Sequence, residues 1–104
     1  MIGGDRAALA EIVDAFVEEA PGRLAELRRG AEQGDATLAG RAAHTLKSNG
    51  LTFGAVELAS LCRRLEVAAR ADELAGSAEL IDRVEEQWAI VQRELVALRA
   101  GARP

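Results

Sequence analysis

The chain has 104 residues, of which 49% are apolar and 29% are charged, a composition typical of one small globular domain spanning residues 1–104. Its net charge of −4 and its three aromatic residues argue against a nucleic-acid partner. No apolar stretch approaches the roughly 18 to 20 residues that cross a bilayer, and residues 1–6 lack the apolar core of a signal peptide. We therefore expect a cytoplasmic protein that binds neither nucleic acid nor membrane.

The first expected element is a long helix from about Asp5 to the turn at residues 33–35. Ala, Leu, Glu and Arg dominate the sequence and β-branched residues are sparse, which favours helix almost throughout. Pro21 lacks an amide donor and crowds the preceding turn, so we expect a kink at residues 19–22. Apolar residues recur here at steps of three and four, namely Leu9, Ile12, Val13, Phe16, Val17, Leu24 and Leu27.

Three further helices are expected after this turn. One covers about residues 36–51 with Asp35 as its N-cap, the next begins near Gly54, and the last runs from the N-cap Ser77 to Gly101. Four amphipathic helices with short connections predict an all-α, antiparallel four-helix bundle with a kinked first helix. Because four helices already enclose one core, we expect a monomer. The expected inward residues are Leu38, Ala42, Leu46, Asn49 and Phe53, then Val56, Leu58, Leu61, Leu65 and Ala68, then Leu80, Ile81, Val84, Trp88, Val91, Leu95 and Leu98.

The single histidine, His44, falls on the opposite side of the helix over residues 36–51. At about 100° per residue it lies at the centre of the solvent-facing side. Lys47 follows one helical turn later, where its ammonium can neutralise oxygens of a group carried on the ring. An exposed imidazole beside a cation suits the acceptance of a phosphoryl group, a transfer that depends mainly on alignment and charge neutralisation. The alternative is a solvated surface histidine without a function.

Other residues on this exposed face suggest a docking surface for another protein. Gly40 and Ser48 are small enough to allow a close approach, and Leu51 is apolar although it faces solvent. Arg41 lies on the same side. We expect no metal site and no cofactor, because the one cysteine, Cys62, and the one histidine would leave only carboxylates as further ligands.

The sequence around His44 resembles the signature of histidine-containing phosphotransfer (HPt) domains. The resemblance covers about residues 42–70 and joins a His-x-Leu-Lys core to a Gly-Ala pair ten residues after the histidine and then to a Leu-x-x-Leu-Cys helix. The matching residues are Ala43-His44-Thr45-Leu46-Lys47-Ser48, then Phe53-Gly54-Ala55, Leu58, Leu61-Cys62 and Leu65-Glu66.

The resemblance implies a four-helix bundle whose His44 takes a phosphoryl group from the aspartyl phosphate of a response-regulator receiver domain and passes it to another receiver. It implies that Lys47 stabilises the phosphoryl group. Partners would be receiver domains, hybrid sensor histidine kinases or both. The Mg²⁺ that the reaction needs would belong to the receiver, and the chain would be a phosphotransfer intermediary with no ATP-dependent kinase activity.

Two positions depart from the commonest HPt pattern. Ser48 stands where many members have glycine after the lysine. Glu66 falls at the spacing of a glutamine that contacts the histidine or phosphoryl group in some members, but an ionised carboxylate cannot donate to phosphate. Glu66 could instead accept from the ring N–H of His44 and orient the other nitrogen for attack. Arg70, one turn further, is expected to reduce negative charge near the site.

Two other functions are compatible with the sequence. One is the phosphoacceptor domain of a chemotaxis-type histidine kinase, labelled by an ATP-binding domain rather than by a receiver. The other is a helical adaptor that is never phosphorylated, in which receiver binding would not depend on His44.

Overall fold

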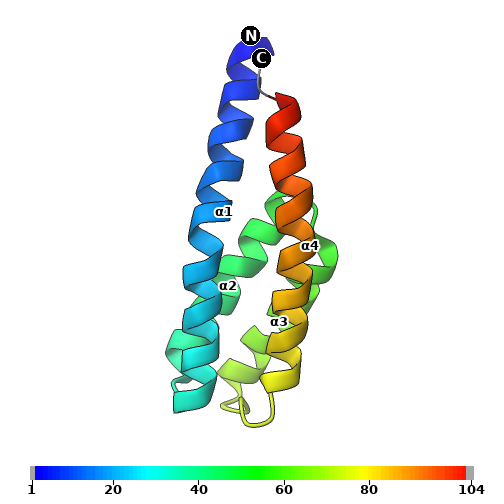
Figure 1. Cartoon of the computed structure of the whole chain (residues 1–104). Coiled ribbons are helices and arrows are strands. Elements are labelled where there is room, and N and C mark those ends of the chain that lie inside the picture. The colour runs from blue at the N-terminus through cyan, green and yellow to red at the C-terminus, as the bar shows by residue number, and fades with distance from the viewer. Residues whose placement is uncertain (1, 103–104) are drawn as a thin grey trace.

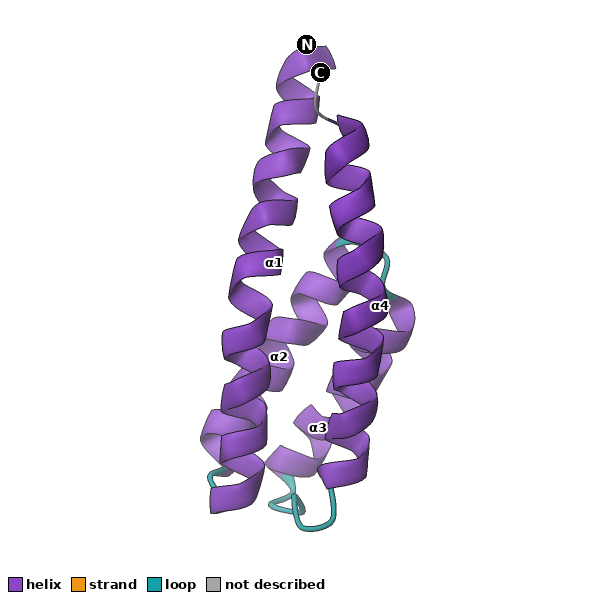
Figure 2. Cartoon of the chain, in the orientation of Figure 1, coloured by secondary structure: helices purple, strands orange, loops and turns teal. Residues whose placement is uncertain are grey.

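Short loops join four helices: α1 (Ile2–Gln33), α2 (Ala36–Thr52), α3 (Val56–Arg70) and α4 (Ala78–Ala102). The computed structural model describes the backbone of residues 2–102 and the side-chain surroundings of residues 7–101. The terminal residues 1 and 103–104 of the predicted domain lie outside this range. The all-α prediction is confirmed, since none of the described residues belongs to a strand (Figure 2). No described helix is both long enough and apolar enough to cross a membrane.

The helices form an elongated antiparallel bundle about 47 Å long and 20 Å wide. Each packs against its neighbours in the order α1, α2, α3, α4 and back to α1. Helices α1 and α4 are the long pair and extend beyond the turn between α2 and α3 (Figure 1). The site residues predicted on α2 and α3 are therefore carried by the short, closely packed half of the molecule.

Helix α1 continues through Pro21 without a break. Pro21 therefore does not divide the helix, and the kink expected at residues 19–22 stays a prediction. Pro21 is exposed, while Ala20 beside it is fully buried. Further along the helix, Arg28 binds Asp82 and Glu85 of α4 and fixes these two long helices together.

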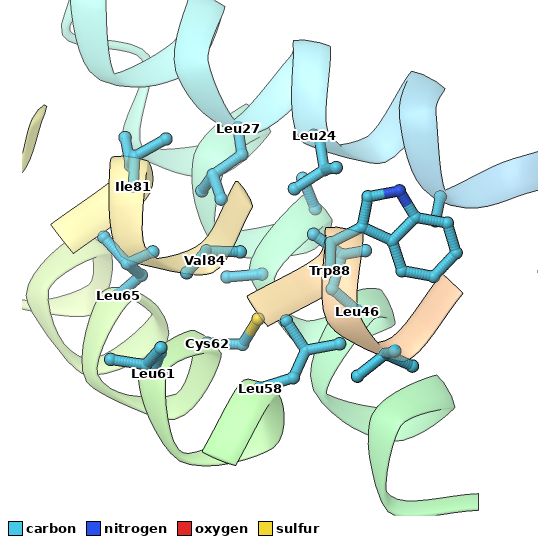
Figure 3. Packing of buried hydrophobic residues seen from close by; sticks show 14 of the residues in the cluster. Leu24, Leu27, Leu46, Leu58, Leu61, Cys62, Leu65, Ile81, Val84 and Trp88 are labelled. Atoms are coloured by element: carbon cyan, nitrogen blue, oxygen red, sulfur yellow. The ribbon is translucent and has the colours of Figure 1, made fainter. Parts of the chain in front are cut away.

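The core is aliphatic and runs along the axis of the bundle (Figure 3). Phe16 lies at the level of the α2–α3 turn, stacked on Phe53 with ring centroids 5.4 Å apart and edge-to-face with Trp88 at 5.0 Å. The residues with the largest fully buried side chains are Leu27, Leu46, Leu58, Leu65, Ile81, Val13, Val84 and Cys62.

Three expected core residues are exposed instead: Ile12, Val56 and Leu98. Ile12 precedes Phe16 by one turn and therefore lies beyond the α2–α3 turn that Phe16 contacts through Phe53. Leu98 is near the end of α4, which extends beyond the same turn. Val56 is the first residue of α3, before the helix enters the core. The apolar periodicity was correct for the helices but did not show where the neighbouring helices stop.

Candidate functional site

Helix α2 is held at its N-terminus by Asp35, whose carboxylate accepts the amide hydrogen of Leu38 at 3.1 Å. It ends at a turn in which Gly54 has a positive φ of 71° and the amide of Ala55 donates to the Gly50 carbonyl at 2.8 Å. This tight turn returns the chain so that α3 runs antiparallel to α2. The two helices thereby place His44 and Lys47 beside Glu66 and Arg70.

The buried face of α2 differs from the expected one. Its fully buried residues are Ala39, Ala42, Ala43, Leu46 and Gly50, so the face centres near Leu46, whereas Leu38 and Asn49 are only partly buried. At about 100° per residue the expected arc runs from Leu38 to Leu46, and the buried face is rotated by roughly 40–60° from the middle of that arc. His44 is therefore not at the centre of the solvent-facing side but is displaced toward α3.

Small residues allow α3 to approach α2 closely. A methyl group added at Gly40 would lie 3.3 Å from the Cβ of Ala69, and one at Gly50 would lie 3.6 Å from the Cβ of Ala59. Gly40 is partly buried at this contact, so it serves helix packing as well as leaving space near His44. The short distance between the helices is what brings a glutamate of α3 within reach of a histidine of α2.

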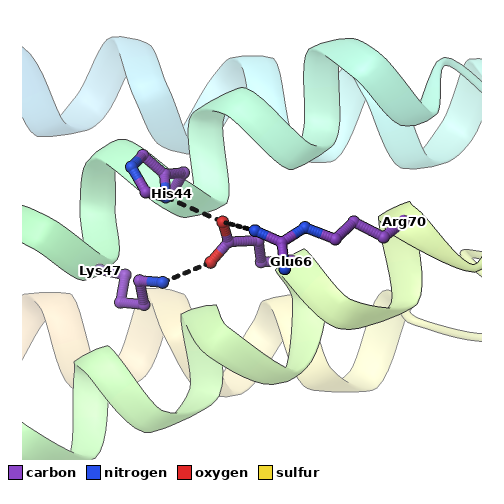
Figure 4. A network of polar contacts seen from close by, with 4 residues as sticks. All are labelled: His44, Lys47, Glu66 and Arg70. Carbon is purple, nitrogen blue, oxygen red and sulfur yellow. Dashed lines mark hydrogen bonds and ion pairs between the residues drawn. The ribbon is translucent and has the colours of Figure 1, made fainter.

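The centre of the site is Glu66, whose side chain is only 7% exposed. Its Oε2 lies 2.8 Å from Nδ1 of His44 and accepts from Arg70 at 3.0 Å, and its Oε1 accepts from Lys47 at 2.6 Å (Figure 4). The hydrogen bond from Lys47 lowers the pKa of Glu66, against the opposing effect of burial and with help from the hydrogen bond to His44. Glu66 is therefore an anion held between a ring nitrogen and two cations.

The imidazole itself remains accessible. The His44 side chain is 60% exposed, and in Figure 4 its other ring nitrogen points away from Glu66. Because an ionised carboxylate can only accept, the contact at Nδ1 requires the proton on that nitrogen. The second nitrogen, Nε2, then carries the free lone pair when the ring is neutral. The arrangement presents a nucleophilic nitrogen toward solvent.

The remaining predicted site residues surround this cluster. Arg41 and Ser48 are exposed on α2, and Arg70 is 73% exposed on α3. Lys47 is 23% exposed, because its chain lies along the junction of the two helices to reach Glu66. Leu51 is 58% exposed and lines a hollow of about 210 Å³ with Lys47, Val56, Ala59, Ser60 and Arg63.

A larger open groove of about 690 Å³ lies on the other side of His44. It is lined by Arg23, Ala36, Thr37, Gly40, Arg41, His44, Thr45, Glu66, Ala69 and Arg70. Sequence reasoning missed Arg23, because this residue belongs to α1 and meets the site only through tertiary packing. Among the described residues, no group of three or more His, Cys, Asp or Glu side chains could hold a metal ion.

Cys62 lies at the centre of the core rather than in the site. It is fully buried, and loss of solvation raises the pKa of its thiol to about 12. The thiolate that redox or metal chemistry needs is therefore strongly disfavoured. Its role is to pack against the surrounding aliphatic residues.

Comparison with known proteins agrees with this geometry. The family model of the Hpt domain matches residues 11–101. The crystal structure of histidine-containing phosphotransfer protein B (HptB) from Pseudomonas aeruginosa PAO1 is similar, with a TM-score of 0.84 and 34% sequence identity over 90% of this chain and 82% of that chain. Curated protein sequences provide no match. The extent of the family match, together with this structural similarity, shows that the chain belongs to the Hpt domain family.

Proposed function

We propose that this protein relays phosphoryl groups between aspartates of response-regulator receiver domains through a phosphohistidine at His44. Membership of the Hpt family and the similarity to a histidine-containing phosphotransfer protein support a function in a phosphorelay. The observation that carries the assignment of the residue is the contact between the buried Glu66 and Nδ1 of His44. It leaves an exposed imidazole with one nitrogen free to attack.

In the proposed step, the lone pair of Nε2 attacks the phosphorus of a receiver aspartyl phosphate. An N–P bond forms as the bond between phosphorus and the aspartate oxygen breaks, and the carboxylate leaves with the electron pair. The Nδ1 proton stays hydrogen-bonded to Glu66, which stabilises the positive charge that develops on the ring. Transfer to the next receiver is the reverse reaction with another aspartate.

Charge near the ring would favour the phosphorylated state. Lys47 and Arg70 both contact Glu66, so their cationic groups already lie beside the ring that would carry the phosphoryl dianion. A small shift of either side chain would exchange the carboxylate for a phosphoryl oxygen, because both are anionic oxygen acceptors of similar strength. We assign phosphoryl stabilisation to Lys47 and a secondary contribution to Arg70.

The face around His44 is the proposed receiver-binding surface. Ser48 leaves space for a close approach, Gly40 contributes to the groove, and exposed Leu51 offers an apolar contact. We infer a monomeric cytoplasmic intermediary that has no kinase activity of its own and needs no cofactor. The Mg²⁺ would be supplied by the receiver, and a hybrid sensor kinase would be the source of the first receiver.

A phosphotransfer assay with radiolabelled receivers tests this proposal. Each receiver of the source organism, and separately the catalytic domain of each histidine kinase with ATP, is mixed with the wild-type protein and with His44→Gln. We expect receivers to transfer acid-labile phosphate to the wild type and none to the variant, while circular dichroism shows the variant to be folded. Labelling of His44→Gln would refute the assignment of the residue.

The same assay separates the alternatives. Labelling by a kinase catalytic domain but by no receiver would assign the chain to the phosphoacceptor domain of a kinase. Receiver binding without labelling, and with the same affinity for His44→Gln, would show a helical adaptor.

A further inference from the structure

The groove beside His44 has a charge opposite to that of the whole chain. The chain carries a net charge of −4, yet the groove is lined by three arginines, Arg23, Arg41 and Arg70, and by a single carboxylate, Glu66. Glu66 is buried and already receives hydrogen bonds from two cations. The surface that a partner would meet on this side of His44 is therefore cationic.

The three arginines differ in their present contacts. Arg23 pairs with Glu26 at 2.8 Å on its own helix, and Arg70 binds Glu66 at 3.0 Å. Arg41 is exposed and makes no side-chain hydrogen bond or ion pair with any residue that the structure describes. Its guanidinium offers a full set of donors to an incoming carboxylate, and binding would not break an existing pair.

The other side of the site has a different chemistry. Beyond Lys47, the hollow next to Leu51 is flanked by exposed apolar side chains, Leu51 at 58% and Val56 at 68%. This hollow contains Lys47 and Arg63 besides its apolar side chains, whereas the cationic groove contains His44, and the two have no residue in common. A partner that covers His44 would thus meet three arginines on one side, and on the other side exposed apolar side chains next to Lys47 and Arg63.

The groove is open along its length and is formed by helices α1, α2 and α3. A protein segment fits such a surface better than a small molecule, which binds in a concave site that buries most of its surface. The groove is also continuous with the residue to which a receiver must dock. From the charge and this continuity we propose that the groove seats an acidic segment of the receiver domain that exchanges phosphate with His44. This inference rests on the proposed function.

Such an arrangement would fix how the receiver is placed. Acidic side chains would lie toward Arg41 and apolar ones toward Leu51, so a receiver rotated on this face would bring its apolar groups onto the arginines of the groove and leave those arginines unpaired. Complementary charge of this kind contributes mainly to association rate and partner choice, and its effect falls as salt screens it. The groove therefore would determine which receivers exchange phosphate rapidly.

The test compares two charge reversals of equal size. Arg41→Glu changes the groove, while the control Arg64→Glu changes an exposed arginine of α3 that lines a different pocket near α4. The probe is the receiver domain that labels wild-type His44 fastest, and the bimolecular transfer rate is measured at about 50 mM and about 500 mM salt. We expect Arg41→Glu to lower the rate roughly 10-fold at low salt and much less at high salt, and Arg64→Glu to change it less than about two-fold.

An acidic residue of that receiver can then be replaced by a basic one. If this second substitution restores the transfer rate of Arg41→Glu, it identifies the side chain that pairs with Arg41. Equal losses in the two variants would show only a general field effect and would overturn the proposal, as would an unchanged rate in Arg41→Glu. The groove would be assigned to a small anion instead if the wild type bound inorganic phosphate saturably and Arg41→Glu removed this binding without changing the rate of transfer from the receiver. The measurement on the wild type tests the proposed function separately. If the proposed function is wrong, no receiver labels His44 of the wild type.

Discussion

Nδ1 of His44 lies 2.8 Å from Oε2 of Glu66, although the two residues come from different helices and are separated by 22 positions in the sequence. The contact joins an exposed ring to a nearly buried carboxylate. A carboxylate in this position determines which ring nitrogen carries the proton, in the way that outer hydrogen-bond partners orient metal-binding histidines. We therefore expect the reactivity of the α2 histidine to depend on a residue on α3.

Glu66→Ala should remove this preference for one tautomer. We expect the long-range ¹H–¹⁵N NMR pattern of the neutral ring to change from the Nδ1–H form to a mixture, and the transfer rate to fall roughly 10-fold. Glu66→Gln should retain most of the rate, because the amide oxygen can still accept from Nδ1–H. An unchanged tautomer and rate in Glu66→Ala would mean that the carboxylate has only a packing role.

Lys47→Ala should shorten the lifetime of the phosphohistidine. The ammonium that now contacts Glu66 is a cation that can move to a phosphoryl oxygen, so its loss removes a charge-assisted hydrogen bond. We expect the half-life of the isolated phosphoprotein to fall roughly 3- to 10-fold and the protein to remain folded, since Glu66 keeps Arg70 and His44. Arg29→Ala, an exposed substitution on α1, provides the control. Identical half-lives in the two variants would leave Lys47 with a structural role only.

The crossing of α1 and α2 depends on Gly30. A Cβ at this position would lie 2.7 Å from the backbone nitrogen of Ala39, which cannot move without shifting α2. Gly30→Ala should therefore lower the free energy of unfolding by about 1–3 kcal/mol, measured by urea denaturation. Gly22→Ala on the same helix should raise it by about 0.5–1 kcal/mol, because a Cβ at this exposed position meets nothing within 4 Å and glycine disfavours helix. If the free energy of unfolding changed in the same direction in both variants, the close contact between Gly30 and Ala39 would be contradicted.

The sequence predicted the elements well because helix formation here is determined locally. Asp35 accepts from the Leu38 amide as an N-cap should. Ser77 also occupies an N-cap position, since its carbonyl accepts from the Ile81 amide, but its hydroxyl donates to the Leu74 carbonyl at 2.6 Å instead of accepting from the helix. The capping position could be predicted from residue type, whereas the direction of the hydroxyl depends on a loop conformation that the sequence pattern does not contain.

The site was less predictable because it depends on how α2 is rotated. Ala39, Ala43 and Gly50 are small, and an apolar periodicity based on large residues did not count them as core. Their burial turns His44 toward α3. The resemblance to HPt domains suggested a Glu66–His44 contact, but the convergence of Lys47 and Arg70 on the same carboxylate follows from the close α2–α3 packing. Arg23 reaches the groove from α1, and no motif around it in the sequence indicated that it lies near the site.

The lowered pKa of Glu66 makes part of the stability pH-dependent. The hydrogen bond from Lys47 is the main cause, so the folded state holds the carboxylate ionised at pH values where the unfolded chain begins to protonate it. Its contribution is fully present above the ordinary pKa of about 4.5 and is lost as the pH falls through the lower folded value. We expect the difference in unfolding free energy between wild type and Glu66→Gln to favour the wild type more at pH 7 than at pH 3. A larger wild-type advantage at pH 3 would mean that burial dominates and raises the pKa.

Cys62 should be unreactive until the bundle opens. Its side chain is fully buried between α3 and the rest of the core, and desolvation raises the pKa of the thiol to about 12, so both access and thiolate formation are suppressed. Labelling with a disulfide reagent at pH 8 should be at least about 100-fold slower in buffer than in 6 M guanidinium, since it requires an opening of the core. Gly30→Ala should accelerate the labelling of the native protein by increasing the population of open molecules, while Gly22→Ala should slow it. Rapid labelling of the wild type in buffer would show that the α3 face carrying Cys62 opens independently of the bundle.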